Sequence, residues 1–364
     1  MKISTIVGAR PQFIKAGMIS RAIVRHNQLS HHKIEEKILH TGQHYDANMN
    51  HVFFDDLKLS RPTWQLQCGH GTHAEMTANM LIEIEKILLA ERPDFVLVYG
   101  DTNSTLAGAL TASKLHIPVV HVEAGLRSFN KQMPEEINRI LTDHMSTYLF
   151  CPTQTAIQNL KNEHITQHVY HVGDVMYDAA LSFGQLAETT STILSSLQLK
   201  EKQFYLCTVH RAENTDQQAC LTGIVQAMAE IATLEFPVIF PLHPRTKAYL
   251  DKYQLNKLIA SNPYFKLIPP LNYLDMIMLE KKAATIFTDS GGVQKEAYFH
   301  RTPCVTLRNE TEWVETVSAG WNQLVGYQTD EIVNGLRCEK QRFDIEDYGD
   351  GQAAQKIIDR LINS

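Results

Sequence analysis

Short runs of β-branched and aromatic residues alternate along the chain with longer segments in which apolar residues recur every three or four positions. The short runs are typical of buried strands, and the longer segments are typical of amphipathic helices. Their regular alternation predicts an α/β architecture, in which parallel sheets carry helices on both faces.

The predicted strands form two groups. In the first half they lie at residues 3–7, 37–40, 95–98, 119–122 and 148–150, with helices between them, for example over residues 72–89 and 134–145. The pattern restarts with strands at residues 204–209, 238–240, 265–268, 285–287 and 304–306. We therefore expect two doubly wound, Rossmann-like domains that face a cleft, each with its ligand edge at the carboxyl ends of its strands.

No low-complexity linker separates the two groups of strands. The turn at Gly173-Asp174 marks the expected boundary, so we assign residues 1–172 to an N-terminal domain and residues 173–347 to a C-terminal domain. Residues 348–364 follow a turn-rich patch and contain a final amphipathic segment. One arrangement packs this segment back on the first domain.

Length and charge narrow the classes of function. The chain has 364 residues, enough for about two domains of roughly 150 residues each. Its 34 Lys and Arg against 40 Asp and Glu give a formal net charge of -6. We expect no nucleic-acid partner, because no general basic field is present, and an anionic ligand must meet local basic residues.

The same sequence argues against membrane and secretory classes. Its apolar runs are too short to span a bilayer, and residues 3–7 lead directly into polar positions rather than a signal peptide. The six cysteines are scattered without a C-x-x-C pair, which is typical of reduced thiols. We expect a cytoplasmic protein with no membrane association.

Three strand-to-helix junctions of the first half carry candidate chemistry. Gly8 ends a buried strand, and Arg10 and Lys15 then combine with helix-start amides to suit a phosphate or carboxylate, unless they are simply a surface turn. Asp101 follows the strand at residues 95–98, where it suits either a ligand crevice or a helix N-cap.

The third junction gathers carboxylates. Glu123 ends an apolar strand, which is costly unless the charge is used. Glu135 and Glu136 follow Pro134 in a first helical turn, where the helix dipole alone explains them. Arg139 lies one turn beyond Glu135, so acids that converge here are able to divide acid and base roles.

The second half offers an anion site. His210 follows one strand, and Ser290-Gly291-Gly292 opens a helix directly after another. Small residues with free amides there suit a diphosphate, and Glu296, one turn later, is placed to reach the hydroxyls of a ribose. The histidines lack metal-binding spacing, and no G-x-G-x-x-G follows a strand, so we expect no metal and no cofactor.

Together these segments resemble the non-hydrolysing UDP-N-acetylglucosamine 2-epimerases, whose fold is similar to that of GT-B glycosyltransferases. The resemblance spans essentially the whole chain. It rests on G-A-R-P-Q-F-I-K, G-D-T-N-S-T, H-V-E-A-G-L-R, P-E-E-I-N-R, H-R-A-E-N, T-D-S-G-G-V-Q-K-E and Y-G-D-G, in the family's order.

The resemblance implies roles for individual residues. Catalytic roles fall to Asp101, Glu123, Glu135, Arg139 and His210, and substrate-binding roles to Arg10, Lys15, Leu271, Tyr273, Met276, Ser290, Gly291, Gly292, Glu296 and Trp313. In the implied reaction, loss of UDP and of the proton on carbon 2 gives a glycal, and UDP returns with protonation from the other face. The family also implies a homodimer.

Two departures from the common family pattern point to a subgroup. Gln12 and Trp313 resemble members that act on UDP-2,3-diacetamido-2,3-dideoxyglucuronate, whose manno product serves surface polysaccharides such as O antigen or capsule. A neutral Gln12 would remove one repulsion from a sugar carboxylate, whereas Trp313 replaces an arginine, for which Arg245 is a candidate substitute. Residues 42–45 differ from the pattern of members activated by UDP-N-acetylglucosamine.

Three alternatives stay open at this point. The substrate is UDP-N-acetylglucosamine in the first, and the chain is a GT-B glycosyltransferase in the second. In the third the chain is a non-catalytic sensor of nucleotide sugars.

Overall fold

The computed structural model describes residues 1–43, 54, 59–338 and 340–363. Two compact units emerge: Met1–Ala179 together with Glu346–Ser364, and Ala180–Ile345. The boundary between them falls inside helix α7 (Val175–Thr190), and the chain rejoins the first unit at Glu346. The second unit is therefore inserted into the sequence of the first.

The first unit contains a parallel sheet with the strand order β3-β2-β1-β4-β5-β6-β7. Its strands are β1 (Lys2–Val7), β2 (Glu35–His40), β3 (Trp64–Gln65), β4 (Phe95–Tyr99), β5 (Val119–Val122), β6 (Tyr148–Cys151) and β7 (Val169–His171). Strands β1, β4, β5 and β6 are largely buried, and their sequences are accordingly mostly apolar.

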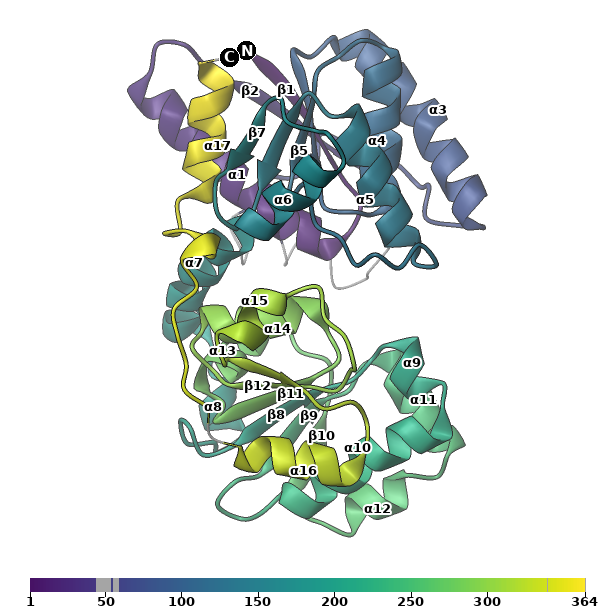
Figure 1. Cartoon of the computed structure of the whole chain (residues 1–364), viewed down its shortest axis with the longest axis vertical. Coiled ribbons are helices and arrows are strands. Elements are labelled where there is room, and N and C mark those ends of the chain that lie inside the picture. Colours follow the sequence, from purple (N-terminus) through teal and green to yellow (C-terminus); the bar gives the residue numbers. More distant parts are fainter. Residues whose placement is uncertain (44–53, 55–58, 339, 364) are drawn as a thin grey trace. The chain divides into compact units, whose positions relative to one another are not determined.

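Helices cover both faces of this sheet, with α3, α4 and α5 packed side by side on one face and α1 and α17 on the other (Figure 1). Their bounds are α1 (Arg10–Leu29), α3 (His73–Glu91), α4 (Asn103–Lys114), α5 (Pro134–Met145), α6 (Gln154–Asn162) and α17 (Ala353–Ile362), with a short 3-10 turn η1 (Glu346–Tyr348).

The second unit repeats the plan with the strand order β10-β9-β8-β11-β12-β13. Its strands are β8 (Tyr205–Thr208), β9 (Val238–Pro241), β10 (Phe265–Ile268), β11 (Thr285–Thr288), β12 (Cys304–Thr306) and β13 (Asn322–Leu324). Its helices are α8 (Ile193–Ser196), α9 (Ala212–Thr215), α10 (Gln218–Ile231), α11 (Pro244–Lys252), α12 (Asn256–Ala260), α13 (Tyr273–Lys282), α14 (Gly291–Phe299), α15 (Val314–Ser318) and α16 (Thr329–Arg337).

Each sheet reverses its direction of winding once. In the first unit the reversal lies between β1 and β4, and in the second it lies between β8 and β11. Loops diverge at such points, and ligands of open α/β sheets bind there, at the carboxyl ends of the strands. All four predicted polar junctions of the two halves lie on these or adjacent strands, and the predicted α/β fold with two doubly wound sheets is confirmed.

The predicted sequence pattern missed strands β3, β7 and β13. They have two or three residues each and occupy edges of the sheets. An edge strand is not covered on all sides, so its sequence is not a continuous apolar run. The strands that the pattern did predict are nearer the sheet centres, except β10.

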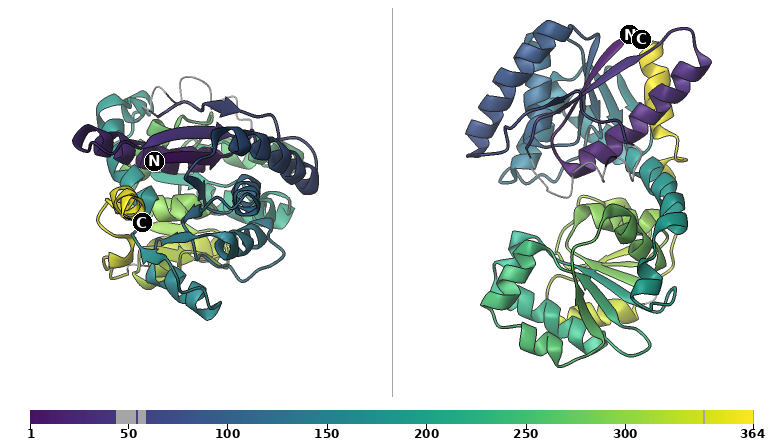
Figure 2. Two further views of the ribbon diagram at one scale, coloured as in Figure 1. Left: turned by 90° about the horizontal axis from the view of Figure 1, so that it is seen from above. Right: turned by 180° about the vertical axis from the view of Figure 1, so that it is seen from behind.

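The last helix of the chain, α17, packs against α1 (Figure 2). Ile357 and Ile358 of α17 are fully buried. The carboxylate of Asp178, on α7, accepts hydrogen bonds from the amides of Ala353 and Ala354 at 3.1 and 2.8 Å. These contacts make α17 an integral part of the first unit.

Candidate functional site

A buried ion pair joins two of the predicted residues of the first unit. Lys15, on α1, pairs through Nζ with Oε2 of Glu123, which directly follows β5. Each side chain is only 11% exposed, so each charge offsets the cost of burying the other. Glu123 holds a backbone φ of +72°, an unfavourable conformation for a residue with a side chain, in a turn that aims its carboxylate at Lys15.

Gly100 brings the next loop against this pair. Its φ is +60°, and a Cβ at this position would lie 3.3 Å from Oε2 of Glu123 and 3.7 Å from Nζ of Lys15. Both the conformation and the close approach favour glycine. The residue that follows, Asp101, therefore starts its loop beside the Lys15 and Glu123 pair.

Asp101 forms a second ion pair. Nη2 of Arg139 lies 2.5 Å from Oδ2 of Asp101, whose side chain is 31% exposed. The cap of α4 is Thr102, whose hydroxyl accepts a hydrogen bond from the Thr105 amide, so the alternative that Asp101 is the helix N-cap is wrong. Its carboxylate is instead presented, partly exposed, against a cation.

The two neighbouring glutamates of α5 differ sharply. Glu136 is buried and accepts hydrogen bonds from Arg139, from the Ser128 amide and hydroxyl, and from the Phe129 amide. Glu135 is exposed and makes no hydrogen bond or ion pair with any residue that the structure describes. Glu136 thus fixes the arginine and a loop, whereas Glu135 has its carboxylate in solvent.

Gln12 links the loops after β1 and β4 through its buried side-chain amide. It is 2% exposed. Its carbonyl oxygen accepts the amides of Gly8 and Ala9, and its amide nitrogen donates to the Tyr99 carbonyl and to two threonine hydroxyls. Its polar atoms are therefore occupied in joining the loops after β1 and β4, and the interpretation that a neutral Gln12 removes a repulsion from a sugar carboxylate stays a prediction.

The stretch at residues 42–45 is described in part. The Gln43 side chain accepts hydrogen bonds from the Ser104 amide and hydroxyl, at the start of α4. His44 and Tyr45, on which the prediction about activation depended, lie outside the described residues.

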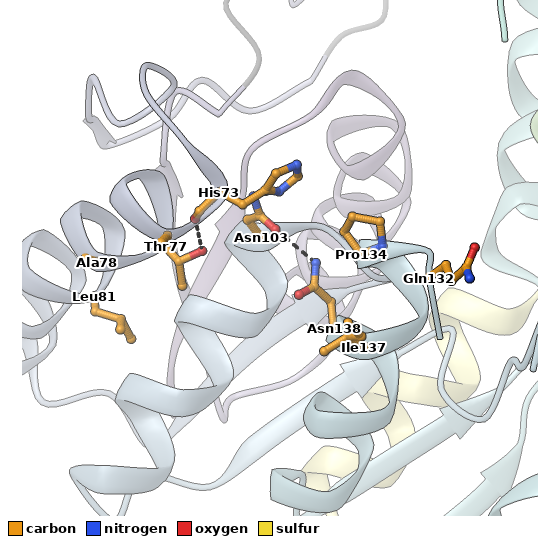
Figure 3. A pocket seen from close by; sticks show the side chains of 10 residues that line it. His73, Thr77, Ala78, Leu81, Asn103, Gln132, Pro134, Ile137 and Asn138 are labelled. Carbon is orange, nitrogen blue, oxygen red and sulfur yellow. Dashed lines mark hydrogen bonds between the residues drawn. The ribbon is translucent and has the colours of Figure 1, made fainter. Parts of the chain in front are cut away.

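A pocket of about 570 Å³ opens on the helical face of the first unit, between α3, α4 and α5 (Figure 3). Its lining is mostly apolar, with Asn103 and Asn138 at one end. Asn138 donates to the Asp101 carbonyl and to the side chain of Asn103, which the figure shows as a dashed line. None of the predicted site residues lines it.

The second unit builds its site on backbone amides. Asp289, fully buried after β11, accepts hydrogen bonds from the amides of His210 and Arg211, at the end of β8, and from Asn214. Nδ1 of His210 lies 3.5 Å from Oδ1 of Asp289, and the imidazole is 40% exposed. One carboxylate thereby sets the path of the loop that carries two basic side chains.

Helix α14 begins next to that loop. Its N-cap is Ser290, whose hydroxyl accepts a hydrogen bond from the Val293 amide, and Gly291 and Gly292 form the first turn. A Cβ on Gly291 would lie 3.4 Å from Oε2 of Glu312, 3.5 Å from Nε1 of Trp313 and 3.8 Å from Nη2 of Arg211. The free amides of this turn and the neighbouring guanidinium suit an anion.

Trp313 is in contact with a cation. Nζ of Lys295 lies 3.9 Å from the centre of a Trp313 ring, which is a cation–π contact. Arg308 is an ion-pair partner of Glu312 at 3.2 Å. Burial alone would raise the pKa of Glu312, but the hydrogen bond and charge of Arg308 outweigh it, so the pKa is lowered and the carboxylate stays ionised.

Glu296 lies one turn into α14 and is 9% exposed. Its Oε1 accepts a hydrogen bond from the Tyr273 hydroxyl at 3.2 Å. Leu271 and Met276 pack against the apolar core beneath them. The structure therefore places the two predicted binding residues Glu296 and Tyr273 in direct contact.

The two remaining candidate cations are Arg10, in the first unit, and Arg245, in the second. Arg10 is the first residue of α1 and is half-buried. Arg245, the suggested substitute for the missing arginine, lies at the start of α11, where Asp216 binds its guanidinium at 2.5 Å.

Sequence reasoning gave no role to Asp289, Lys295, Arg308, Glu312 or Glu136, although all lie within or beside the motifs it used. Asp289 acts through partners distant in sequence, which a linear pattern does not reveal. The pairs Arg308–Glu312 and Glu136–Arg139 are four and three residues apart, a spacing that exposed helix faces share, so it did not mark them. Within the described ranges, the structure shows no group of three His, Cys, Asp or Glu placed to hold a metal ion. It also shows no helix there with the length and hydrophobicity to cross a bilayer.

Comparison with known proteins places the chain in a family. The family model of UDP-N-acetylglucosamine 2-epimerase matches residues 27–362. A UDP-N-acetylglucosamine 2-epimerase homolog of Methanococcus maripaludis is 53% identical over 100% of both chains. The UDP-2,3-diacetamido-2,3-dideoxy-D-glucuronate 2-epimerase of Pseudomonas aeruginosa is 51% identical over 99% of both chains.

Solved structures agree. The UDP-GlcNAc 2-epimerase of Methanocaldococcus jannaschii, in complex with UDP-GlcNAc and UDP, superposes with a TM-score of 0.88 at 44% identity over 100% of both chains. The Neisseria meningitidis enzyme bound to UDP-GlcNAc gives a TM-score of 0.88 at 30% identity, also over 100% of both chains. The chain therefore belongs to the non-hydrolysing UDP-N-acetylglucosamine 2-epimerase family, whose members are isomerases with a GT-B-like fold.

Proposed function

We propose that this protein inverts carbon 2 of UDP-2,3-diacetamido-2,3-dideoxyglucuronate to the manno form, by elimination and re-addition of UDP. The hydrogen on carbon 2 is not next to a carbonyl, so its removal alone is too costly. Its loss becomes feasible when the diphosphate leaves carbon 1 at the same time, because the electron pair of the C–H bond then forms the double bond between carbons 1 and 2 of a glycal instead of remaining as a carbanion. Re-addition of UDP with protonation from the other face completes the inversion.

The observation that carries the proposal is the pair of carboxylate–cation contacts after β4 and β5. Asp101 meets Arg139, and Glu123 meets Lys15, on adjacent loops of one sheet edge. A reaction that removes a proton from one face and returns one to the other needs two acid–base groups. We assign these roles to Asp101 and Glu123, with Glu135 as a further candidate and Arg139 as their support.

We assign the nucleotide to the second unit. The amides of Ser290, Gly291 and Gly292 would bind the diphosphate, and Glu296 with Tyr273 the ribose. Leu271 and Met276 would line the uracil site, and His210 with Arg10 and Lys15 would stabilise the charge that develops on the leaving diphosphate. The relatives of known structure with bound UDP-GlcNAc support a UDP-sugar as the ligand of this protein.

The choice of substrate rests on the 51% identical Pseudomonas aeruginosa enzyme and on Trp313. With tryptophan at this position, the Lys295 ammonium lies on a neutral ring. An arginine there would place a second positive charge against Lys295.

The test is to incubate the purified protein with each UDP-sugar and to follow the product by NMR. Epimerised product from the diacetamido-glucuronate, at a higher kcat/KM than from UDP-N-acetylglucosamine, is the expected result. The reverse order would assign the protein to UDP-N-acetylglucosamine. In heavy water, deuterium should enter carbon 2 of the product, and an unlabelled product would exclude the elimination route.

We also propose that the protein is a cytoplasmic homodimer that supplies a surface polysaccharide such as O antigen or capsule. Sedimentation of the purified chain tests the dimer, since a monomer at micromolar concentration would contradict it. Loss of the surface polysaccharide on deletion of the gene tests the supply role.

A further inference from the structure

His121 is a polar residue in the middle of the otherwise apolar strand β5, and its side chain is fully buried. Nδ1 lies 2.7 Å from Oδ1 of Asp143, on α5, and Nε2 lies 2.8 Å from the carbonyl oxygen of Gly100. A backbone carbonyl only accepts hydrogen bonds, and so does an ionised carboxylate. Both ring nitrogens therefore face acceptors.

The partners of Asp143 decide which group holds the extra proton. Its Oδ2 accepts hydrogen bonds from Nη1 of Arg127 at 2.7 Å and from the Gly125 amide at 3.1 Å. A guanidinium and an amide N–H both favour the ionised carboxylate. With Asp143 ionised, His121 must carry protons on both nitrogens in order to donate to Asp143 and to Gly100.

The surrounding charges balance such a buried imidazolium. Arg127 also donates to both carboxylate oxygens of Glu163, which follows α6, and His144 of α5 lies 3.4 Å from Glu163. Burial would lower the pKa of Arg127, but its bonds to Glu163 and Asp143 raise it overall. Two cations, Arg127 and His121, thus meet two anions, Asp143 and Glu163. Cys151 of β6 is also near Asp143, and its raised pKa, caused by burial and then by that charge, keeps it neutral.

This cluster touches both loops of the candidate site. The Gly100 carbonyl that His121 binds precedes Asp101, and Gly100 itself donates its amide to the Val122 carbonyl at 3.0 Å. The Gly125 amide that Asp143 binds closes the turn that holds Glu123 at its positive φ. His121 and Asp143 therefore connect the backbones that carry the two carboxylates.

We propose that His121 is a positioning residue whose doubly protonated ring, paired with Asp143, fixes the loops of Asp101 and Glu123 relative to one another. The charge state follows from the buried contacts alone. The effect on turnover rests on the proposed function, because it presumes that Asp101 and Glu123 do the chemistry.

Nitrogen-15 NMR of the whole protein labelled at histidine tests the charge state without any substrate. We expect one slowly exchanging imidazole with protons on both nitrogens, and its loss in His121→Gln identifies it among the 17 histidines. In Asp143→Asn the second proton should be lost, leaving a neutral ring. A single ring N–H for His121 in the unmodified protein would overturn the proposal.

Kinetics test the positioning. A misplacement of about 1 Å costs roughly 10²-fold, so His121→Gln should lower kcat by about that factor while KM stays within about threefold. His31→Gln, on an exposed histidine, is the matched control and should change neither. Unchanged kcat in a folded His121→Gln protein would overturn the positioning role, and should that variant fail to fold, the NMR result on the unmodified protein decides. If instead Asp101→Asn left turnover intact while the doubly protonated ring persisted, the proposed function would fail and the charge assignment would stand.

Discussion

Each unit has a candidate site at the carboxyl ends of its central strands, and the two sites are made of different chemical groups. In the first unit, charged side chains meet from α1, α5 and the loops after β4 and β5: Glu123 pairs with Lys15, and Asp101 and Glu136 share Arg139. In the second unit, the exposed end of α14 offers backbone amides, and the charged side chains around it are held by one another. The first is suited to moving protons, and the second to holding an anion.

This difference has an energetic side. A buried ion pair contributes little to the free energy of folding, because the cost of desolvating the two charges offsets their attraction. Removing one partner is nevertheless strongly destabilising, because the other charge is left buried and unpaired. Amides at a helix start need no such compensation, since they are unsatisfied in any helix. We therefore expect substitutions in the first site to affect turnover and folding strongly, and substitutions in the second to affect mainly the affinity for UDP.

The largest effect is expected for Asp101→Asn. It removes a proton-transfer group, so kcat should fall by about 10³-fold, or about 4 kcal/mol, while the dissociation constant of UDP stays within about twofold. Steady-state kinetics and calorimetric titration measure the two quantities. Asp94→Asn, at the opposite end of β4, is the control and should leave kcat unchanged. Equal losses of affinity and turnover would move Asp101 to a binding role.

A second experiment separates the neighbouring glutamates of α5. Glu136→Gln removes the buried charge that Arg139 and the residue 128–129 loop contact, and should lower the free energy of unfolding by about 3 kcal/mol. Glu135→Gln alters only an exposed side chain and should change it by less than about 0.5 kcal/mol. Urea unfolding measures both, and a loss in turnover for Glu135→Gln at unchanged stability would support its proposed catalytic role.

The first unit itself contains an anion bound by helix-start amides, the carboxylate of Asp178 at the start of α17, and its contribution to stability should depend on pH. Asp178 accepts two amides of α17, and burial raises its pKa to about 6. A raised pKa means that this group stabilises the fold most below about pH 4 and loses that contribution as pH rises through 6. Relative to Asp178→Asn, the unmodified protein should lose roughly 3 kcal/mol between pH 4 and pH 7. Parallel unfolding curves across that range would contradict the raised value.

The smallest effect is expected in the second unit. Glu296→Ala removes a charged hydrogen-bond partner for the ribose and should weaken UDP binding about tenfold, with a smaller change in kcat. Glu331→Ala, on the exposed side of α16, is the control. Undiminished affinity in Glu296→Ala would show that this residue does not bind the ribose, and would weaken the assignment of UDP binding to the second unit.

The contrast also explains what the sequence could predict. The central strands and the Ser290-Gly291-Gly292 helix start were predicted because their signals are local: apolar runs, and small residues directly after a strand. The first site depends on partners far apart in sequence. Thr102 rather than Asp101 caps α4, and Gln12 is consumed in joining two loops, neither of which a linear pattern reveals.

Glu136 is a second case that the sequence alone could not resolve. Glu135 and Glu136 are equivalent in sequence, both in a first helical turn, and the dipole argument treats them alike. The structure distinguishes them because α5 turns one toward Arg139 and the core and the other toward solvent. Edge strands such as β3 were missed because partial exposure removes their apolar signature.

The insertion of the second unit into the first has a consequence for biosynthesis. Residues leave the ribosome in order, so Ala180–Ile345 are all available while the first unit still lacks α17 and its buried isoleucines. The first unit therefore completes its core only after α17 has been translated. A nascent chain halted before Glu346 would contain all of Ala180–Ile345 but would leave the core of the first unit without the two buried isoleucines of α17.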